Sequence, residues 1–221
     1  GKGKAGRAAQ GRSASRAYGL SARYFNALWA LCRFASAVVI VCWLFSPSGA
    51  MAAERLILAL GDSLTAGYGL SAEDGFTEQL AGALKAAGAN ARVVNGGVSG
   101  DTSAGGLARA DWLLAERPEL VIVELGANDA LRGLEPAETR RNIDALVARL
   151  RKTGARVVLT GMMAPPNLGR EYAAEFNRIF PEVAKKHKVV LYPFFLDGVA
   201  ANPAFNQSDG IHPNAKGVSV I

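Results

Sequence analysis

Short apolar runs alternate with longer amphipathic stretches along the chain from residue 54 onward. Five of these runs are rich in leucine or β-branched residues and lack regular polar alternation, which is typical of strands in a parallel sheet covered on both faces. They occupy residues 55–60, 91–96, 119–126, 155–161 and 188–193. Helical spacing of apolar residues is found between them, at residues 77–87, 107–115, 136–152 and 172–186. The alternation predicts a single α/β domain with a three-layer, doubly wound parallel sheet.

The first 52 residues differ from the rest in charge and pattern. They hold seven of the 25 basic residues and no acidic residue, so the net charge of +6 comes from this segment. After Arg33 come about a dozen mostly apolar residues, a Ser-Pro-Ser-Gly break, and small residues at Ala50 and Ala52. This order is typical of a secretory signal peptide. We therefore expect residues 1–52 to be a signal peptide and N-terminal extension, cleaved near Ala52, and residues 53–221 to be a periplasmic or secreted domain.

The composition of residues 53–221 limits the possible partners. No basic stripe with interleaved aromatic residues occurs there, so we expect no nucleic-acid partner. Both cysteines, Cys32 and Cys42, lie in the leader, which leaves the domain without a disulfide framework or a thiolate metal site. The apolar run of the leader is shorter than the ~20 residues that span a bilayer. We expect membrane contact only through the leader during export, and a monomeric domain.

Small and polar clusters follow four of the predicted strands. In doubly wound sheets, ligands bind beyond the carboxyl ends of the strands, so these clusters are the candidates for chemistry. GDS with Ser63 follows the first run, NGGVSGDTS with Gly100 the second, and GAND with Asn128 the third. SDGIHPN, with Asp209 and His212, comes after the fifth run. We expect these residues to meet at one edge of the sheet.

These residue types supply the parts of an acyl-transfer site. Ser63 stands at a strand-to-helix corner, where its hydroxyl can act as a nucleophile and its N–H lies near a helix N-terminus. His212 is the candidate base, and Asp209 can hold the imidazole tautomer that leaves Nε2 free for Ser63. The Gly100 N–H and the Asn128 amide can donate to an oxyanion together with the Ser63 N–H.

Each residue also has a simpler interpretation. A serine after a strand often only caps a helix, and DGIHPN can be a turn followed by a helix cap. The other histidine, His187, lies among lysines and is expected on a solvated face. Three further acids, Asp62, Asp101 and Asp129, are expected to brace loops or cap helices. The serine motif is GDSL rather than GxSxG, so it does not favour an α/β-hydrolase.

The four blocks in this order resemble the SGNH (GDSL-type) hydrolases over about residues 56–221. The resemblance implies a flavodoxin-like sheet, with Ser63 as nucleophile, His212 as base and Asp209 as its partner. Gly100 and Asn128 would complete an oxyanion hole with the Ser63 N–H. Chains of this family continue past HPNAKG into a closing helix, so we expect residues 53–221 to lack that last helix.

One branch of the family is similar in more detail. The segments LGDSLTAGYGL, NGGVSGDTSAGGLAR, VELGANDALRGL and PFFLDGVA look like bacterial periplasmic acyl-CoA thioesterases I, also described as arylesterases or lysophospholipases. This implies hydrolysis of acyl esters and thioesters without a metal or an organic cofactor. It also implies a mobile loop, here residues 162–172. That loop provides an apolar wall built from Met162, Met163, Pro165, Pro166 and Leu168.

Two other functions remain open from the sequence. The same catalytic frame serves deacetylases that act on acetylated sugars. A non-catalytic binding module with a flavodoxin-like fold would instead bind a phosphate group at the glycine-rich edge of the sheet. Against the binding module, neither a GxxxxGK nor a GxGxxG run follows any predicted strand, and such a module has no need for an Asp-x-x-His pair.

Overall fold

The computed structural model describes residues 53–221, in which five parallel strands form one sheet of order β2-β1-β3-β4-β5. The strands are β1 (Arg55–Gly61), β2 (Ala91–Gly97), β3 (Leu120–Glu124), β4 (Arg156–Thr160) and β5 (Val190–Tyr192). The chain moves outward from β1 to β2 and then returns to β3 on the other side of β1. The predicted doubly wound α/β sheet is confirmed, and its topological switch point lies between β1 and β3.

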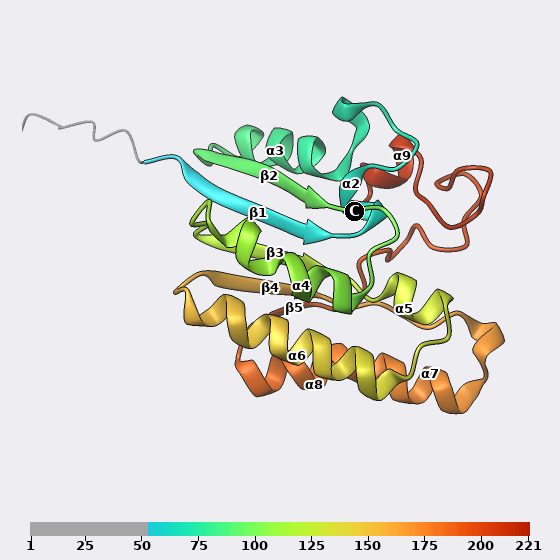
Figure 1. Ribbon diagram of the computed structural model, residues 1–221. Coiled ribbons are helices and arrows are strands. Elements are labelled where there is room, and N and C mark those ends of the chain that lie inside the picture. The colour runs from blue at the N-terminus through green and yellow to red at the C-terminus, as the bar shows by residue number, and fades with distance from the viewer. Residues whose placement is uncertain (1–52) are drawn as a thin grey trace, which may run out of the picture. The chain divides into compact units, whose positions relative to one another are not determined.

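Helices cover both faces of this sheet (Figure 1). They are α2 (Ser63–Ala66), α3 (Phe76–Ala86), α4 (Ser103–Leu114), α5 (Ala127–Leu131), α6 (Pro136–Lys152), α7 (Arg170–Asn177), α8 (Ile179–His187) and α9 (Ala215–Val218), with 3₁₀ turns η1 (Ala72–Asp74) and η2 (Pro166–Leu168). Helix α4 packs on α6, and α6 packs on α8, whereas α3 packs beside β2. In Figure 1, α3 lies above the strands and α6, α7 and α8 lie below them.

The apolar face of α6 shows why this layer forms. Ile143, Leu146, Val147 and Leu150 recur at helical spacing, and all four side chains are fully buried. Buried strand residues such as Leu58 and Val121, which pair across β1 and β3, belong to the same core. The strands are thereby held in a fixed register, and their carboxyl ends meet at one edge.

The predicted helix at residues 172–186 is wrong as a single element, because the chain breaks at Arg178 into α7 and α8. Pro181 has no N–H to bond the carbonyl of Asn177 four residues earlier, so a continuous α-helix is unfavourable here. Helix α4 starts at Ser103, earlier than predicted, with Thr102 as its N-cap. The helix predicted at residues 136–152 is confirmed at both ends.

In the part of the chain that the structure describes, no helix has the length and apolar character needed to cross a bilayer. The predicted signal peptide at residues 1–52 lies outside the described residues and stays a prediction.

Candidate active site

The corner that carries Ser63 is a one-turn helix directly after β1. Asp62 caps α2, since its Oδ1 accepts the N–H of Leu64 at 3.0 Å, and Ser63 is the first residue of the helix. The N–H of a first helical residue has no partner inside its own helix. Within residues 53–221 the Ser63 N–H has no hydrogen-bond acceptor. Strand β1 therefore brings Ser63 to the carboxyl edge with an unpaired N–H beside its hydroxyl.

The loop after β5 brings His212 and Asp209 to the same edge. His212 Nε2 lies 2.9 Å from Ser63 Oγ, and His212 Nδ1 lies 2.6 Å from Asp209 Oδ2. The backbone N–H groups of Ile211 and His212 both donate to Asp209 Oδ1, at 3.0 Å each. The bond from the imidazole, helped by these backbone bonds, lowers the pKa of Asp209 to about 2. Asp209 is thus a carboxylate at neutral pH that accepts the Nδ1 proton, and Nε2 is left to accept the proton of the Ser63 hydroxyl.

Two residues that the sequence did not single out hold this loop. Gln207 Nε2 donates to the carbonyl of Tyr68 at 2.8 Å and to that of Pro213 at 2.9 Å. This amide ties the His212 loop to the loop after α2. The Tyr68 ring lies against the imidazole of His212, with ring centroids 4.6 Å apart. Gln207 and Tyr68 are far apart in sequence and their bond uses a backbone carbonyl, so no sequence pattern marks it.

Gly100 lies in the loop after β2, where its φ of +85° is in the left-handed region that favours glycine. Its carbonyl accepts Arg132 Nη2 at 2.8 Å, but its N–H has no acceptor in the described part of the chain. The N–H groups of Ser63 and Gly100 are therefore both unpaired in the described part of the chain, which leaves them available to donate to a ligand.

Asn128 lies in α5, after β3, and both hydrogens of its amide already have acceptors. Its Nδ2 donates to Asp62 Oδ2 at 3.1 Å and to the carbonyl of Asp101 at 2.9 Å. An oxyanion can use this amide only by sharing one hydrogen with a present acceptor. Catalytic hydrogen bonds often form fully only when the substrate is bound. The structure places the Asn128 amide against Asp62, the N-cap of α2, with both of its hydrogens bonded to protein acceptors.

Arg109 on α4 fastens the ends of two strands. Its guanidinium donates to the carbonyls of Gly96 at 2.6 Å and Gly61 at 2.8 Å. It also forms a 2.6 Å ion pair with Asp101, whose carbonyl is one of the acceptors of Asn128. Asp101 therefore braces the loop, as the sequence predicted. Arg109 itself was missed, because two of its three partners are backbone carbonyls.

Asp129 joins three helices beneath the same loops. It is almost fully buried and accepts the N–H of Ser103 at 2.8 Å and the hydroxyl of Ser103 at 2.5 Å. The Thr139 hydroxyl donates to it at 3.1 Å. This bracing role was also predicted from the sequence.

An apolar pocket of about 470 Å³ opens beside Ser63 and His212. Its apolar lining includes Leu131, Met162, Met163, Pro165, Phe194 and Ile211. Of the predicted wall, Leu168 alone does not line the pocket. The Ala164 N–H donates to Asn177 Oδ1 at 2.9 Å, which fastens this wall to α7. Such a surface suits a hydrocarbon chain.

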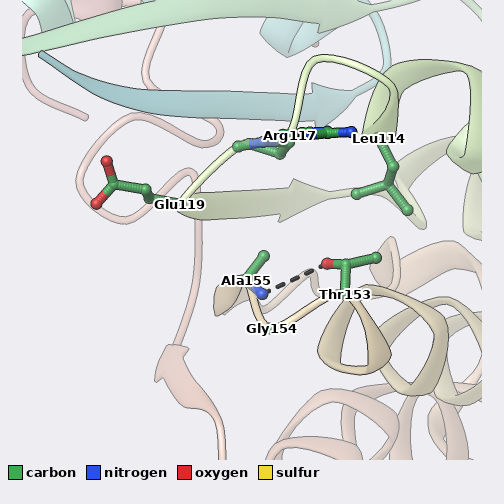
Figure 2. A pocket seen from close by; sticks show the side chains of 7 residues that line it. Leu114, Arg117, Glu119, Thr153, Gly154 and Ala155 are labelled. Atoms are coloured by element: carbon green, nitrogen blue, oxygen red, sulfur yellow. Dashed lines mark hydrogen bonds between the residues drawn. The ribbon is translucent and has the colours of Figure 1, made fainter.

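A second pocket, of about 400 Å³, lies at the opposite edge of the sheet, before β3 and β4 (Figure 2). Figure 2 shows Arg117 and Glu119 along one side of it and the turn from Thr153 to Ala155 along the other. None of the predicted catalytic residues lines this pocket.

His187 lies outside the site, at the end of α8. Its Nε2 is 2.8 Å from Asp144 Oδ1 on α6, and its side chain is only 14% exposed. The expectation of a solvated histidine is therefore wrong, because the carboxylate of α6 packs against the ring. Among residues 53–221, no group of three or more His, Cys, Asp or Glu side chains could hold a metal ion.

Comparison with known proteins gives one family. Residues 59–220 match the GDSL-like Lipase/Acylhydrolase family. Esterase TesA of Pseudomonas aeruginosa is 46% identical over 163 residues, which cover 73% of this chain and 81% of that protein. An arylesterase of Vibrio mimicus is 41% identical over 170 residues, 76% of this chain and 85% of its own. Thioesterase 1/protease 1/lysophospholipase L1 of Escherichia coli K12 is 41% identical over 164 residues, 74% and 77% of the two chains.

The fold agrees with these sequence relatives. The solved structure of AlinE4, described as an SGNH-hydrolase family esterase, is 49% identical and superposes with a TM-score of 0.69. The superposition covers 76% of this chain and 90% of that chain.

Proposed function

Since the chain belongs to the GDSL-like lipase/acylhydrolase family and is an ester hydrolase, we propose that it acts through an acyl-enzyme on Ser63. The observation that carries this proposal is the continuous contact from Ser63 Oγ to His212 Nε2 at 2.9 Å and from His212 Nδ1 to Asp209 at 2.6 Å. A serine that only capped a helix would have no need of this pair. The binding-module interpretation is wrong, because the relatives are hydrolases.

The chemistry follows from these contacts. His212 Nε2 takes the proton of the Ser63 hydroxyl as Oγ bonds to the acyl carbonyl carbon, and Asp209 stabilises the resulting imidazolium. The imidazolium then gives this proton to the departing alcohol or thiol, which leaves an acyl-serine. Water adds in the same way, with His212 as base, and Ser63 departs with the proton while the carboxylic acid is released.

The charge that develops on the carbonyl oxygen needs donors. The unpaired N–H groups of Ser63 and Gly100 supply two, and Asn128 supplies a third by sharing a hydrogen now held by Asp101 or Asp62. One such donor is worth about 10²–10³ in rate.

The apolar pocket beside Ser63 supports an acyl chain longer than acetyl as the group transferred to the serine. Esters and thioesters of fatty acids fit this description, and the relatives include an arylesterase and a thioesterase/lysophospholipase. An acetylated sugar would leave the pocket empty. Rates on p-nitrophenyl esters of increasing acyl length, compared with acetylated xylan, test this choice, and a preference for the polymer would overturn it.

A fluorophosphonate probe tests the nucleophile. We expect labelling of the wild type, none in Ser63→Ala, and full labelling in Ser71→Ala, which removes an exposed hydroxyl bonded to Asp74. Labelling that persists in Ser63→Ala would remove Ser63 from the mechanism.

We also propose that residues 1–52 export the protein, with cleavage near Ala52, and that the domain works outside the cytoplasm as a monomer. The basic, apolar and small-residue order of the leader supports export. N-terminal sequencing of protein recovered from a periplasmic extract tests the cleavage site. Light scattering on the purified domain tests the monomer.

A further inference from the structure

Glu124, the last residue of β3, is an unusual side chain to find under an active site. It is fully buried, and its Oε2 accepts the Thr65 hydroxyl at 2.8 Å and the Asp62 N–H at 3.3 Å. Its Oε1 is buried with no hydrogen-bond partner among the described residues. No Lys, Arg or His of residues 53–221 forms an ion pair with it. A buried carboxylate is strongly unfavourable when one of its oxygens has no hydrogen-bond donor and no cation is nearby. A protonated carboxyl group instead has a hydrogen to donate.

The Asp62 N–H donates to Glu124 Oε2, so the two residues are neighbours, and both side chains are fully buried. The Asp62 carboxyl group is therefore the available acceptor for that hydrogen. Two neighbouring buried carboxyl groups cannot both ionise at low cost, so one of them keeps a proton. Asp62 is the better anion, because the Leu64 N–H donates to its Oδ1 at 3.0 Å and the Asn128 amide donates to its Oδ2 at 3.1 Å. Glu124, whose Oε1 accepts no hydrogen bond, is the group that keeps the proton.

The electrostatic surroundings agree with this assignment. Burial, together with the negative charge of Asp62, raises the pKa of Glu124 well above its ordinary value. Burial also raises the pKa of Asp62, to about 6, against the opposing effect of its hydrogen bonds. The other titratable or charged groups at this corner are His212, which faces Asp62, and the pair of Arg109 with Asp101, which reaches the Gly61 carbonyl.

Gly61 leaves the space that this arrangement needs. A Cβ at Gly61 would lie 2.6 Å from Glu124 Oε2 and 2.7 Å from the Glu124 carbonyl oxygen. The glycine of the GDS corner thus admits Glu124 beneath the Ser63 helix.

From this geometry we infer that Glu124 is a positioning residue that stays protonated in the working enzyme and donates to Asp62, which in turn holds the Asn128 amide beside Ser63. The proton is not transferred during the reaction. Glu124 forms no hydrogen bond with Ser63 or His212, and it acts through Asp62 on the third donor of the oxyanion hole. The inference deepens the proposed function and rests on it for its effect on rate.

Two substitutions separate this role from simple packing. In Glu124→Gln the amide N–H replaces the acid proton and the amide oxygen still accepts from Thr65, so kcat should stay within about threefold of wild type. In Glu124→Met the shape is similar but the donor is lost, so kcat should fall about tenfold or more with KM within about twofold. Thermal unfolding of both variants checks folding. Glu119→Gln, an exposed carboxyl at the other end of β3, is the matched control and should leave kcat unchanged.

Infrared spectroscopy gives a readout that does not depend on activity. The wild type at pH 7 should show the carbonyl band of a protonated carboxyl, and Glu124→Gln should lack it while Glu119→Gln retains it. A wild-type spectrum without that band overturns the inference, as does a loss of kcat in Glu124→Gln equal to that in Glu124→Met. If Ser63 were not the nucleophile, fluorophosphonate labelling would persist in Ser63→Ala while the carboxyl band of the wild type remained, so the two failures are distinguishable.

Discussion

Two groups of polar side chains lie on either side of Ser63, and their acids differ in exposure and in the direction of their pKa shifts. The exposed arm, Asp209 and His212, reaches the serine from the loop after β5, and the Asp209 side chain is 38% exposed. The buried arm, Asp62, Glu124 and Asn128, lies beneath the serine, and both of its acids are fully buried. The pKa of Asp209 falls to about 2, whereas burial raises the pKa values of Asp62 and Glu124.

The difference assigns separate tasks to the two arms. A carboxylate that faces water and accepts an imidazole proton can stabilise positive charge as it forms, so proton movement belongs to the exposed arm. Carboxyl groups that share a proton in a dry interior resist any change of charge, so the buried arm holds geometry. Substitutions in the exposed arm should therefore cost more in rate than substitutions in the buried arm.

The largest effect is expected at His212. Without the imidazole no group remains to take the Ser63 proton, so His212→Ala should lower kcat by about 10⁴-fold or more. His187→Ala is the matched control, since that ring contacts Asp144 and lies outside the site, and should stay within about twofold. Comparable losses in the two variants would contradict the assignment of the base.

The next effect is expected at Asn128. Asn128→Ala removes one oxyanion donor, so kcat should fall by about 10²–10³, or ~3 kcal/mol of transition-state stabilisation, with little change in melting temperature. Asn202→Ala, which removes an amide bonded only to a loop N–H through its oxygen, should leave kcat unchanged. A normal kcat in Asn128→Ala would show that the amide never leaves its resting acceptors.

A smaller effect is expected at Arg109. Arg109→Lys keeps the charge but cannot reach the Gly61 carbonyl, the Gly96 carbonyl and Asp101 together, so the frame of Asn128 loosens. We expect kcat to fall about tenfold with KM nearly unchanged. Arg149→Lys, at an exposed arginine of α6, is the control. A rise in KM without a fall in kcat would place Arg109 in substrate binding instead.

The smallest effect is on folding stability, and its dependence on pH should have opposite signs for Asp209 and for Asp62. The pKa of Asp209 is below its ordinary 3.8, so its stabilisation is present above pH 3.8 and is lost as the pH falls towards about 2. The pKa of Asp62 is raised from 3.8 to about 6, so its contribution is present below pH 3.8 and is lost as the pH rises towards about 6.

Melting temperatures across this range check both signs. Asp209→Asn should lose less melting temperature than wild type as the pH falls from 3.8 towards about 2. Asp62→Asn should lose less melting temperature than wild type as the pH rises from 3.8 to about 6. Slopes of the same sign would mean that the two acids do not differ in environment.

The exposed arm could be predicted from the sequence and the buried arm only in part. Ser63 follows β1 directly, and Asp209 and His212 lie in the longer segment after β5, so parallel-sheet topology brings all three to the carboxyl edge. In the sequence, Glu124 is only an acid inside the apolar run ELVIVELG, because its partners Asp62 and Thr65 belong to the cap and helix of α2, about sixty residues away. The burial of the Glu124 side chain depends on how β3 pairs with β1, and this strand register cannot be predicted from the sequence pattern.

The fold shows the same limit. The sheet and helix α6 were predicted because apolar periodicity is a local signal. The break at Arg178 depends on two opposing effects. Pro181 lacks an N–H and disfavours a continuous helix, whereas the apolar stripe across the segment favours one. The tertiary structure, rather than the stripe, decides that balance.

The most direct test of the account is to trap the acyl-enzyme. Acid quenching during turnover of p-nitrophenyl butyrate, followed by proteolysis and mass spectrometry, locates the acyl group. We predict one butyryl group on Ser63, and none in Ser63→Ala. A butyryl group on another side chain, or turnover without any acylated peptide, would contradict the proposal that Ser63 is the nucleophile.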